Sequence, residues 1–470
     1  MTTIQRVAGS FRDPSGFVFF HNDEVFRSID EPCCAVLMEL ADQGKLEQWV
    51  ENNVIVGTEF VQPGDLLSQL QRELPETHHF LRHETIPLVT YPYEWTVSML
   101  ADAGVHTLDL QIDLLQTGHS LKDATAYNIQ FVHGRPTMID VASIEKPKRL
   151  DVWFAMGQFL QMFVYPLLLV RKRGWDLRSY FLSNLNGRDV ESVAASFGWL
   201  ERLGPSLLLD LTLPLWLHRR AENQEGTQRE LLEKTVSNSS PQIANLKRLR
   251  RKLEKLAAGY QPRGVWADYT TICNYDQQAD DHKQSLVRAI LSQIKPAEVL
   301  DIGCNTGNYS FLAAECGANV TAVDGDHDAV EVLYRRLRDN PASINPLVVD
   351  LGNPSPAIGY RNEERSSFLN RSKPDCVMAL ALMHHLLVSA NMSLEAIRDQ
   401  MHDLTQSDLV IEFVPTSDNM FERLMNFRVD LFQHVNLQTC RDVFEEKFEL
   451  LAEYPIDGSI RTLMHYRKKN

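Results

Sequence analysis

The sequence predicts an α/β protein with two structured domains, an α+β domain followed by an open, mostly parallel sheet with flanking helices. The length of 470 residues exceeds a single hydrophobic core, because domains commonly hold roughly 100–200 residues. In the last part of the chain, apolar strand patterns alternate with helical patterns, which is typical of parallel strands joined by crossover helices. We therefore expect a first domain over 1–218, a charged helical linker over 219–262 and a second domain over 263–470.

The composition is that of a globular protein that acts away from nucleic acid. Hydrophobic residues make up 44% and charged residues 23% of the chain, so extensive disorder is not expected. The formal net charge of −15 disfavours a general role on nucleic acid or anionic lipid, because clustered Lys and Arg hold phosphates. We therefore expect no nucleic-acid partner.

Two segments and the cysteine content bear on the location of the protein in the cell. The apolar run over 152–170 approaches the length of a membrane span, but Gln158, Gln161 and Pro166 interrupt it, so it predicts a buried core helix. No apolar run follows Arg6, so a signal peptide is not expected. The 7 cysteines include no CxxC pair and predict reduced thiols. Together these observations predict a cytoplasmic protein without a transmembrane segment.

Turn and periodicity signals define the elements of the first domain and the linker. Residues 8–27 predict a strand, a Pro-Ser-Gly turn and a second strand, and 31–50 predict a helix. A further long helix is expected to end at Gly118, and HGRP at 133–136 predicts the turn of a hairpin. In the linker, NLKRLRRKLEKLAAG (245–259) predicts a helix whose basic face lies in solvent.

The segment EVLDIGCNTGNYSF (298–311) carries the strongest chemical signal in the sequence. A buried strand ends near Asp301, and Gly303 and Gly307 allow a tight turn that a ligand can approach before a helix begins. The next strand ends at Asp324, 21 positions after Gly303, where a carboxylate can accept hydrogen bonds from both hydroxyls of a ribose. The glycine loop by itself does not decide whether the ligand is NAD or S-adenosylmethionine.

Together with the strands that follow, this segment resembles the class I S-adenosylmethionine-dependent methyltransferases, which have a Rossmann-like sheet. The resemblance covers about 264–470. It implies that the glycine loop lines the methionine part of S-adenosylmethionine, that Asp324 holds the ribose, and that Asp350 lies beside the adenine amino group. The strand that ends near Leu380 matches the fourth motif, which faces the methyl group and the substrate. The cofactor-binding residues implied in this way are Asp301, Gly303, Cys304, Asn305, Gly307, Asp324, Asp350 and Leu380.

Three side chains after these strands are candidates for catalysis. Methyl transfer to a hydroxyl needs a positioned acceptor and a general base, and the neutral imidazole of His384 or His385 can accept a proton near neutral pH. Alternatively, one histidine packs against the cofactor and the other is solvated. Glu412 is a further candidate base or metal partner, although its spacing from the histidines matches no strong metal template.

Three aromatic residues lie before the first strand of this domain. They form either a lid over the cofactor or the ordinary packing of a helix: Trp266, Tyr269 and Tyr275.

The first domain contains a different pattern, in HSLKDATAYNIQFVHGRPTMID (119–140). Phosphoryl transfer needs a carboxylate near the attacking hydroxyl and oxygen ligands for magnesium ions. Asp123 as the base, with Asn128 and Asp140 as metal ligands, has that spacing. The pattern resembles the protein-kinase-like phosphotransferases, including the aminoglycoside and choline kinases, and implies ATP and Mg²⁺ as further cofactors.

Two features depart from that family. GSFRDPSG (9–16) is not a glycine-rich phosphate loop, and NNVIVGTEFV (52–61) carries no lysine for the α and β phosphates. Glu94 is either the partner of such a lysine or a capping-turn acid. The first domain is therefore an active kinase, an inactive kinase-like scaffold or an unrelated helical domain.

Nearly the whole chain resembles a bacterial family of NoeA-like nodulation methyltransferases, on the segments YPYEW, LKDATAYNIQF, MIDVASIE and ALALMHHL. The sequence thus predicts an O-directed methyltransferase for a small-molecule or glycan-type acceptor, with a kinase-like accessory domain. One alternative is a bifunctional enzyme that phosphorylates and methylates the same acceptor, and another is a non-enzymatic partner-binding protein. Neither the acceptor nor the oligomeric state follows from the sequence.

Overall fold

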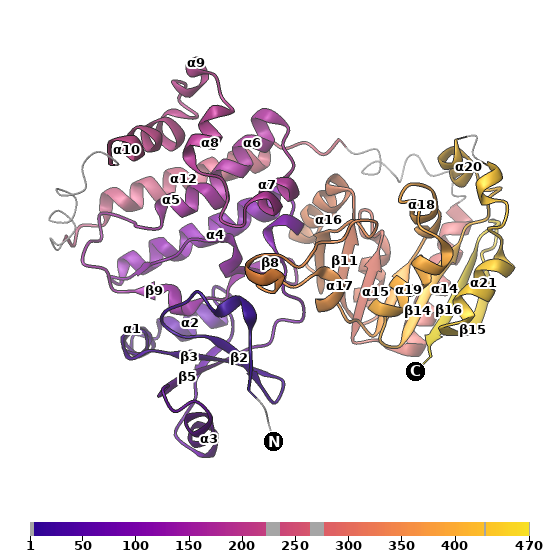
Figure 1. Ribbon diagram of the computed structural model, residues 1–470, viewed down its shortest axis with the longest axis horizontal. Coiled ribbons are helices and arrows are strands. Elements are labelled where there is room, and N and C mark those ends of the chain that lie inside the picture. The colour runs from indigo at the N-terminus through magenta and orange to yellow at the C-terminus, as the bar shows by residue number, and fades with distance from the viewer. Residues whose placement is uncertain (1–3, 222–235, 264–276, 427–428, 470) are drawn as a thin grey trace. The chain divides into compact units, whose positions relative to one another are not determined.

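The computed structural model describes residues 4–221, 236–263, 277–426 and 429–469, and the chain divides into two compact units (Figure 1). The first unit consists of Met1–Gln261 together with the short segment Ile358–Arg365. The second unit consists of Pro262–Ala357 and Ser366–Asn470. The range predicted as a linker therefore lies almost wholly within the first unit.

An antiparallel sheet of five strands forms the N-terminal part of the first unit. Along the sheet the strands are β1 (Gln5–Arg6), β2 (Val18–His21), β3 (Glu24–Ile29), β5 (His79–His83) and β4 (Thr58–Phe60). Asn22 and Asp23 have positive φ, 53° and 63°, and make the tight turn that returns the chain from β2 to β3. Residues 8–10, expected in a strand, instead form a 3-10 turn, so the first of the two predicted strands is wrong over these residues.

The helix expected over 31–50 is divided in two. The φ of +69° at Gly44 separates α1 (Glu31–Asp42) from α2 (Lys45–Glu51), and glycine takes this left-handed conformation without the cost that a Cβ brings. Asp30 caps α1, because its side chain accepts a hydrogen bond from the backbone N–H of Cys33. The helical prediction is confirmed, but that of one continuous helix is wrong.

The long helix predicted to end at Gly118 is α4 (Val97–Gln116), and α12 (Ser240–Ala258) packs along it (Figure 1). A Cβ at Gly104 of α4 would lie 2.7 Å from a leucine methyl group of α12, so glycine allows the two helices to approach closely. α12 contains the basic helix of the predicted linker. Its apolar side belongs to the core of the first unit, since three leucines are fully buried: Leu246, Leu249 and Leu253.

The apolar run over 152–170 forms α5 (Met156–Phe159), a π-helical turn over 160–164 and α6 (Tyr165–Arg173). Pro166 has no N–H to donate to the preceding turn, and a π-helical turn beside it is a common way for a helix to adjust. The prediction of a buried core helix is confirmed, because Phe163 and Leu167 are fully buried. Within the described ranges, no helix has both the length and the apolar character that a bilayer crossing requires.

Short strands and helices complete the first unit. The predicted hairpin around HGRP is confirmed as β7 (Ile129–Val132) paired with β8 (Arg135–Met138). Within the described residues, the remaining strands and α-helices of this unit are α3 (Asp65–Glu73), β6 (Ser120–Leu121), β9 (Ile144–Glu145), α7 (Leu177–Ser183), α8 (Val190–Ala195), α9 (Trp199–Arg202) and α10 (Leu213–Ala221).

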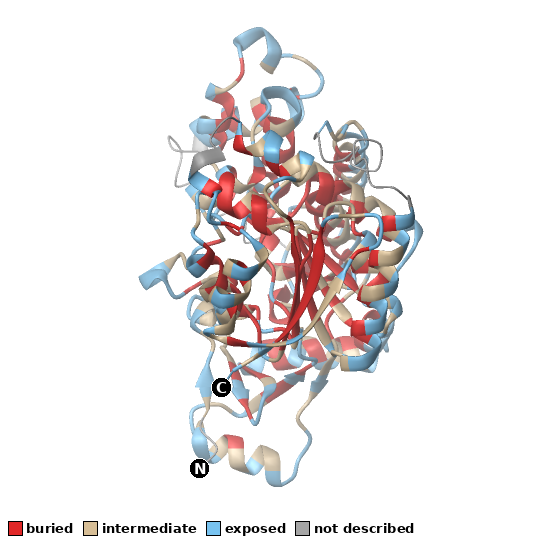
Figure 2. Ribbon diagram, turned by 90° about the vertical axis from the view of Figure 1, so that its right-hand side faces the viewer, coloured by how far each residue is buried: buried red, intermediate tan, exposed pale blue. Residues whose placement is uncertain are grey.

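A seven-stranded sheet forms the centre of the second unit. Its strands lie in the order β12 (Ile344–Val348), β11 (Asn319–Asp324), β10 (Glu298–Ile302), β13 (Cys376–Ala379), β14 (Asp408–Phe413), β16 (Thr462–Lys468) and β15 (Phe448–Pro455). The first five run parallel, and β16 is antiparallel to both of its neighbours. The predicted open α/β sheet is confirmed, and its inner strands β13 and β14 are buried along their whole length. Figure 2 shows buried strands, in red, at the centre of the view.

Helices flank this sheet and share its apolar core. Val287 and Leu291 of α14 and Leu312 of α15 pack in one cluster with Val299 of β10 and Val320 of β11. Within the described residues, the α-helices of the second unit are α14 (Gln277–Ile294), α15 (Asn308–Glu315), α16 (His327–Asp339), α17 (Phe368–Arg371), α18 (Met383–Val388), α19 (Leu394–Leu404), α20 (Asn419–Met425) and α21 (Leu437–Glu445).

Candidate functional site

The order of the parallel strands brings the predicted cofactor residues to one edge of the second unit. After β10 the chain forms β11 and then β12 on one side of it. The later strands β13 and β14 lie on the other side of β10, so the strand order reverses there. In open α/β sheets, ligands bind outside the carboxyl ends of the strands at such a switch point. The loops after β10, β11 and β13 all begin at this edge.

The loop after β10 has the backbone that the glycine pattern predicts. Gly303, Asn305 and Gly307 have φ values of +75°, +50° and +89°, a conformation that glycine and asparagine accept most readily. A Cβ at Gly307 would lie 2.3 Å from Leu333 Cδ1, so a larger residue would have to displace the side chain of Leu333. The buried Oδ1 of Asn305 accepts no hydrogen bond, which leaves an acceptor in the loop for a ligand.

Asp324, at the end of β11, is tied to this loop. Its Oδ2 accepts a hydrogen bond from the backbone N–H of Asn305 at 2.9 Å, and its Oδ1 accepts one from Asp326 at 2.8 Å. Burial raises the pKa of Asp324. Because a carboxylate oxygen can accept more than one hydrogen bond, both oxygens can also accept from a diol.

The other predicted cofactor residues line the same edge or support it. Asp301 is buried and accepts a hydrogen bond from Ser310 Oγ at 2.6 Å, which joins β10 to α15. Burial raises the pKa of Asp301 to about 6. Cys304 and Leu380 are buried beside the core. Asp350 lies two residues beyond β12 and accepts a hydrogen bond from the backbone N–H of Gly352 at 2.8 Å.

The two candidate histidines stand next to each other at the start of α18. The rings of His384 and His385 lie 4.4 Å apart. His384 is only 2% exposed, and burial, followed by the charge of His385, lowers its pKa to about 3. Burial also lowers the pKa of His385, which is less enclosed than its neighbour. Both rings are therefore expected to be neutral near pH 7.

Glu412 occupies a buried ion-pair network at the end of β14. Its side chain is 0% exposed, and its Oε2 lies 2.5 Å from Lys283 Nζ. Arg461 Nη1 lies 3.3 Å from Glu412 Oε1, and Arg461 Nε also pairs with Asp418 at 2.8 Å. A carboxylate held between two cations is a weak proton acceptor, so this geometry favours a structural or positioning role for Glu412.

Sequence reasoning missed Lys283 and Arg461. An acidic residue inside an apolar strand indicates that a cation must lie nearby, but nothing in the pattern says which one. Within the described ranges, no group of three or more His, Cys, Asp or Glu side chains is arranged to hold a metal ion. The aromatic residues of the predicted lid lie outside the described residues: Trp266, Tyr269 and Tyr275.

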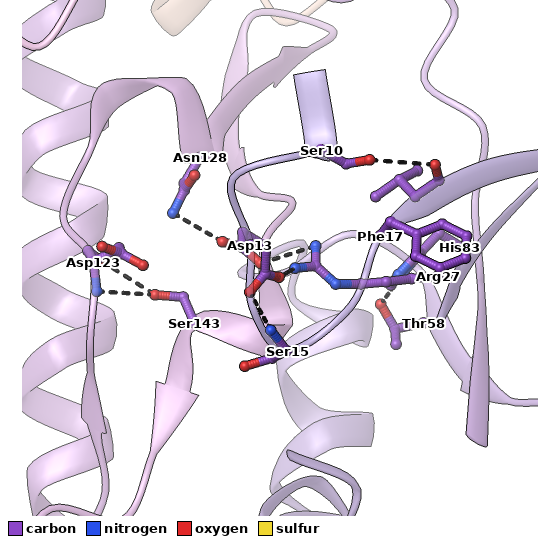
Figure 3. Close-up of polar contacts among 12 residues, drawn as sticks. Ser10, Asp13, Ser15, Phe17, Arg27, Thr58, His83, Asp123, Asn128 and Ser143 are labelled. Carbon is purple, nitrogen blue, oxygen red and sulfur yellow. Dashed lines mark hydrogen bonds and ion pairs between the residues drawn. The ribbon is translucent and has the colours of Figure 1, made fainter. Parts of the chain in front are cut away.

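In the first unit, two of the three predicted residues, Asn128 and Asp140, are linked to an arginine that sequence reasoning missed, while Asp123 contacts Ser143 (Figure 3). Arg27 lies on β3 with a side chain that is 7% exposed, and its Nη1 is 3.0 Å from Asp140 Oδ1. Asn128 Nδ2 donates a hydrogen bond to Asp140 Oδ2 at 3.2 Å. The backbone N–H of Asp123 donates to Ser143 Oγ at 3.1 Å. Burial, followed by the charge of Asp140, raises the pKa of Asp123.

Arg27 is visible in the sequence as a basic residue in a strand, but no pattern marks it as the partner of Asp140. It is the basic residue of the strand EVFRSI (24–29), directly before α1, whereas the cation expected from the kinase-like resemblance is a lysine in the later segment 52–61. Glu94 is fully buried and accepts a hydrogen bond from the backbone N–H of Tyr91 at 3.1 Å. This bond agrees with the capping-turn alternative for Glu94.

Comparison with known proteins agrees with the fold of the second unit. A family model described as "Methyltransferase domain" matches residues 275–445. The N-methyltransferase NodS from Bradyrhizobium japonicum WM9 is 14% identical, with 42% of this chain and 99% of that chain covered and a TM-score of 0.31. The bifunctional kinase-methyltransferase WbdD is 17% identical, with 42% and 39% covered and a TM-score of 0.30. These TM-scores are too low for the two likenesses to bear on function.

The glycine loop, the strand order and the matching family model define the protein as a methyltransferase. Over 470 residues the chain is 32% identical to the nodulation protein NoeA from Rhizobium meliloti (strain 1021), with 98% of this chain and 96% of that protein covered. The chain therefore belongs to the NoeA family. A non-enzymatic partner-binding protein, one of the alternatives from the sequence, does not agree with this assignment.

Proposed function

We propose that the second unit transfers a methyl group from S-adenosylmethionine to an oxygen acceptor of small-molecule or glycan type. The observation that carries the proposal is the position of the Asp324 carboxylate, hydrogen-bonded to the glycine loop at the switch point of the sheet. When bound, S-adenosylmethionine supplies a methyl group activated by a sulfonium. The predicted cofactor-binding residues then contact different parts of this molecule.

The residues of the glycine loop line the methionine part of the cofactor in this proposal: Gly303, Cys304, Asn305 and Gly307. Asp324 accepts hydrogen bonds from the ribose hydroxyls, Asp350 lies beside the adenine, and Leu380 borders the reacting edge. Asp301 supports the site indirectly, because its hydrogen bond with Ser310 holds β10 against α15. The cytoplasm, where S-adenosylmethionine is made available, is the compartment that we propose for this reaction.

His385 is our candidate for the proton acceptor. It is less enclosed than His384, and a neutral imidazole can take the proton of an acceptor hydroxyl as the methyl group is transferred. The pKa of about 3 for His384 makes that ring a poor base near pH 7, so His384 packs against His385 and orients it. Glu412, paired with Lys283 and Arg461, positions β14 and does not itself accept the proton.

We expect His385→Asn to lower the rate of methyl transfer by roughly 10²- to 10⁴-fold, the usual contribution of a general base. Transfer of a tritiated methyl group to a panel of oligosaccharides and hydroxylated small molecules would measure the rate. Binding of S-adenosylmethionine, followed by calorimetry, should be unchanged. Equal rates for wild type and His385→Asn would contradict the role of His385, while absence of cofactor binding to the wild type would contradict the proposed function.

A second candidate is a bifunctional enzyme, and the pairing of Arg27 with Asp140 favours it. In protein kinases a cation on the third strand contacts the phosphates, while an Asp and an Asn hold the magnesium ions. Arg27, Asp140 and Asn128 offer those three functions within one cluster. Asp123 would then accept the proton of the hydroxyl that is phosphorylated, and ATP with Mg²⁺ would be the further cofactors.

The second candidate predicts transfer of the γ-phosphate of ATP to an acceptor in the presence of Mg²⁺. Asp140→Ala should abolish this transfer, because it removes a magnesium ligand and the partner of Arg27. The measurement is incorporation of radioactive phosphate from γ-labelled ATP into the same acceptor panel. Label transfer that survives in Asp140→Ala would exclude the metal role of Asp140.

A further inference from the structure

The loop between β1 and β2, which we call the Val7–Phe17 loop, folds onto the buried cation of the first unit. The carboxylate of Asp13, near the middle of this loop, pairs with the guanidinium of Arg27 (Figure 3). Lys122 Nζ lies 3.8 Å from Asp13 Oδ1 and donates a hydrogen bond to Ser15 Oγ at 3.0 Å. Two basic side chains therefore converge on one carboxylate that the protein itself supplies.

The contacts around Asp13 are those that bind a phosphate. Guanidinium and ammonium groups bind phosphate and carboxylate oxygens in the same way, and the backbone N–H of Ser15 also donates to Asp13 Oδ1 at 2.9 Å. A buried guanidinium needs an anion, and Asp140 already provides one at 3.0 Å from Arg27 Nη1. Asp13 is thus a second anion on Arg27, and it belongs to the connection between β1 and β2, the first two strands of the sheet.

Other contacts hold the same loop in place. A Cβ at Gly16 would lie 1.8 Å from the carbonyl oxygen of Ser28, so the backbone of the loop presses directly on β3. Arg12 Nε and Nη2 donate hydrogen bonds to the two carboxylate oxygens of Glu364, each at 3.2 Å. Glu364 belongs to Ile358–Arg365, the short segment of the first unit. The loop is therefore held in place by contacts with Arg27 and with this segment.

We infer that Asp13 occupies the phosphate position of a nucleoside triphosphate site in the first unit, and that a ligand must displace it. The inference rests on the second candidate function and adds a residue that sets the affinity of the site. Displacement of Asp13 frees Arg27 and Lys122 for the ligand phosphates, while Asp140 and Asn128 stay available for Mg²⁺. Removal of the Asp13 carboxylate should therefore strengthen the binding of Mg-ATP and of inorganic triphosphate.

The test is calorimetric titration of the full chain with Mg-ATP and, separately, with magnesium triphosphate. We expect Asp13→Ala to bind both probes on the order of tenfold or more tightly than wild type, because the ligand phosphates no longer have to displace the Asp13 carboxylate from Arg27 and Lys122. Asp13→Asn keeps the shape of the side chain and should show a gain in the same direction. The matched control is Asp42→Ala, which removes an exposed carboxylate of α1 and should bind as wild type does.

A further variant links the gain to the two cations. In Asp13→Ala/Lys122→Ala, most of the added affinity should be lost, and thermal unfolding of the full chain followed by circular dichroism checks that the first unit is still folded. Equal affinities for wild type, Asp13→Ala and Asp13→Asn would overturn the inference, as would the absence of binding in all of them. Tighter binding without phosphate transfer would support the inference and contradict the second candidate function.

Discussion

Asp324→Ala is expected to abolish the binding of S-adenosylmethionine. A carboxylate that accepts two hydrogen bonds from a ribose contributes roughly 1.5–3 kcal/mol for each bond, so the affinity should fall by at least about 100-fold. The substitution also removes the acceptor for the backbone N–H groups of Asn305 and Asp326. The glycine loop then loses its tie to β11, which adds to the loss.

Calorimetric titration with S-adenosylmethionine measures this effect. Asp339→Ala is a matched control, because it removes an exposed carboxylate at the end of α16 in the same unit. Thermal unfolding of both variants separates a loss of binding from a loss of folding. Unchanged affinity in a folded Asp324→Ala protein would contradict the proposed cofactor site.

Glu412→Ala is expected to destabilise the second unit by roughly 3–5 kcal/mol, the usual effect of removing one partner from a buried ion pair. The variant leaves Lys283, 5% exposed, and Arg461, 6% exposed, without the carboxylate that they share. For a unit of this size the midpoint of thermal unfolding should fall by roughly 6–20 °C. Methyl transfer should decline with it, because β14 lies next to β13, which leads into the candidate histidines at the start of α18.

Thermal unfolding of Glu412→Ala and of the double variant Glu412→Leu/Lys283→Met distinguishes the possible causes. The double variant replaces a buried pair by apolar groups and should recover part of the stability. The control Glu315→Ala breaks the exposed pair with Arg288 and should cost less than about 1 kcal/mol. If Glu412→Gln abolishes methyl transfer at an unchanged midpoint, Glu412 acts as a base and our positioning role is wrong.

Local patterns were sufficient for much of the fold. The strands β10, β11 and β14 and the glycine loop follow from apolar runs and from the glycines at 303 and 307, because burial and positive φ leave direct marks on composition. The basic helix α12 shows the limit of this reasoning. Its charges were visible, but the burial of Leu246, Leu249 and Leu253 depends on a partner helix more than a hundred residues earlier.

The two candidate sites differ in how far the sequence predicts them. For the cofactor site, Asp301, Gly303, Gly307 and Asp324 lie close in sequence, so the distances between consecutive elements predict their grouping. The cluster in the first unit needs Asp13 and Arg27 from the N-terminal sheet and Lys122 and Asp140 from the segment after α4. Spacing within one segment predicted Asp123, Asn128 and Asp140, but it contained no information on the arginine that faces them.

The sequence by itself determined the class of the second unit, the position of the glycine loop and the acidic residue at the end of β11. Only the tertiary structure decided which charges pair: Arg27 with Asp13 and Asp140, and Glu412 with Lys283 and Arg461. The physical reason is that backbone conformation and burial are set by neighbouring residues and leave a periodic pattern. An ion pair is set by the meeting of distant segments, and the sequence carries no mark of which cation will reach a buried carboxylate.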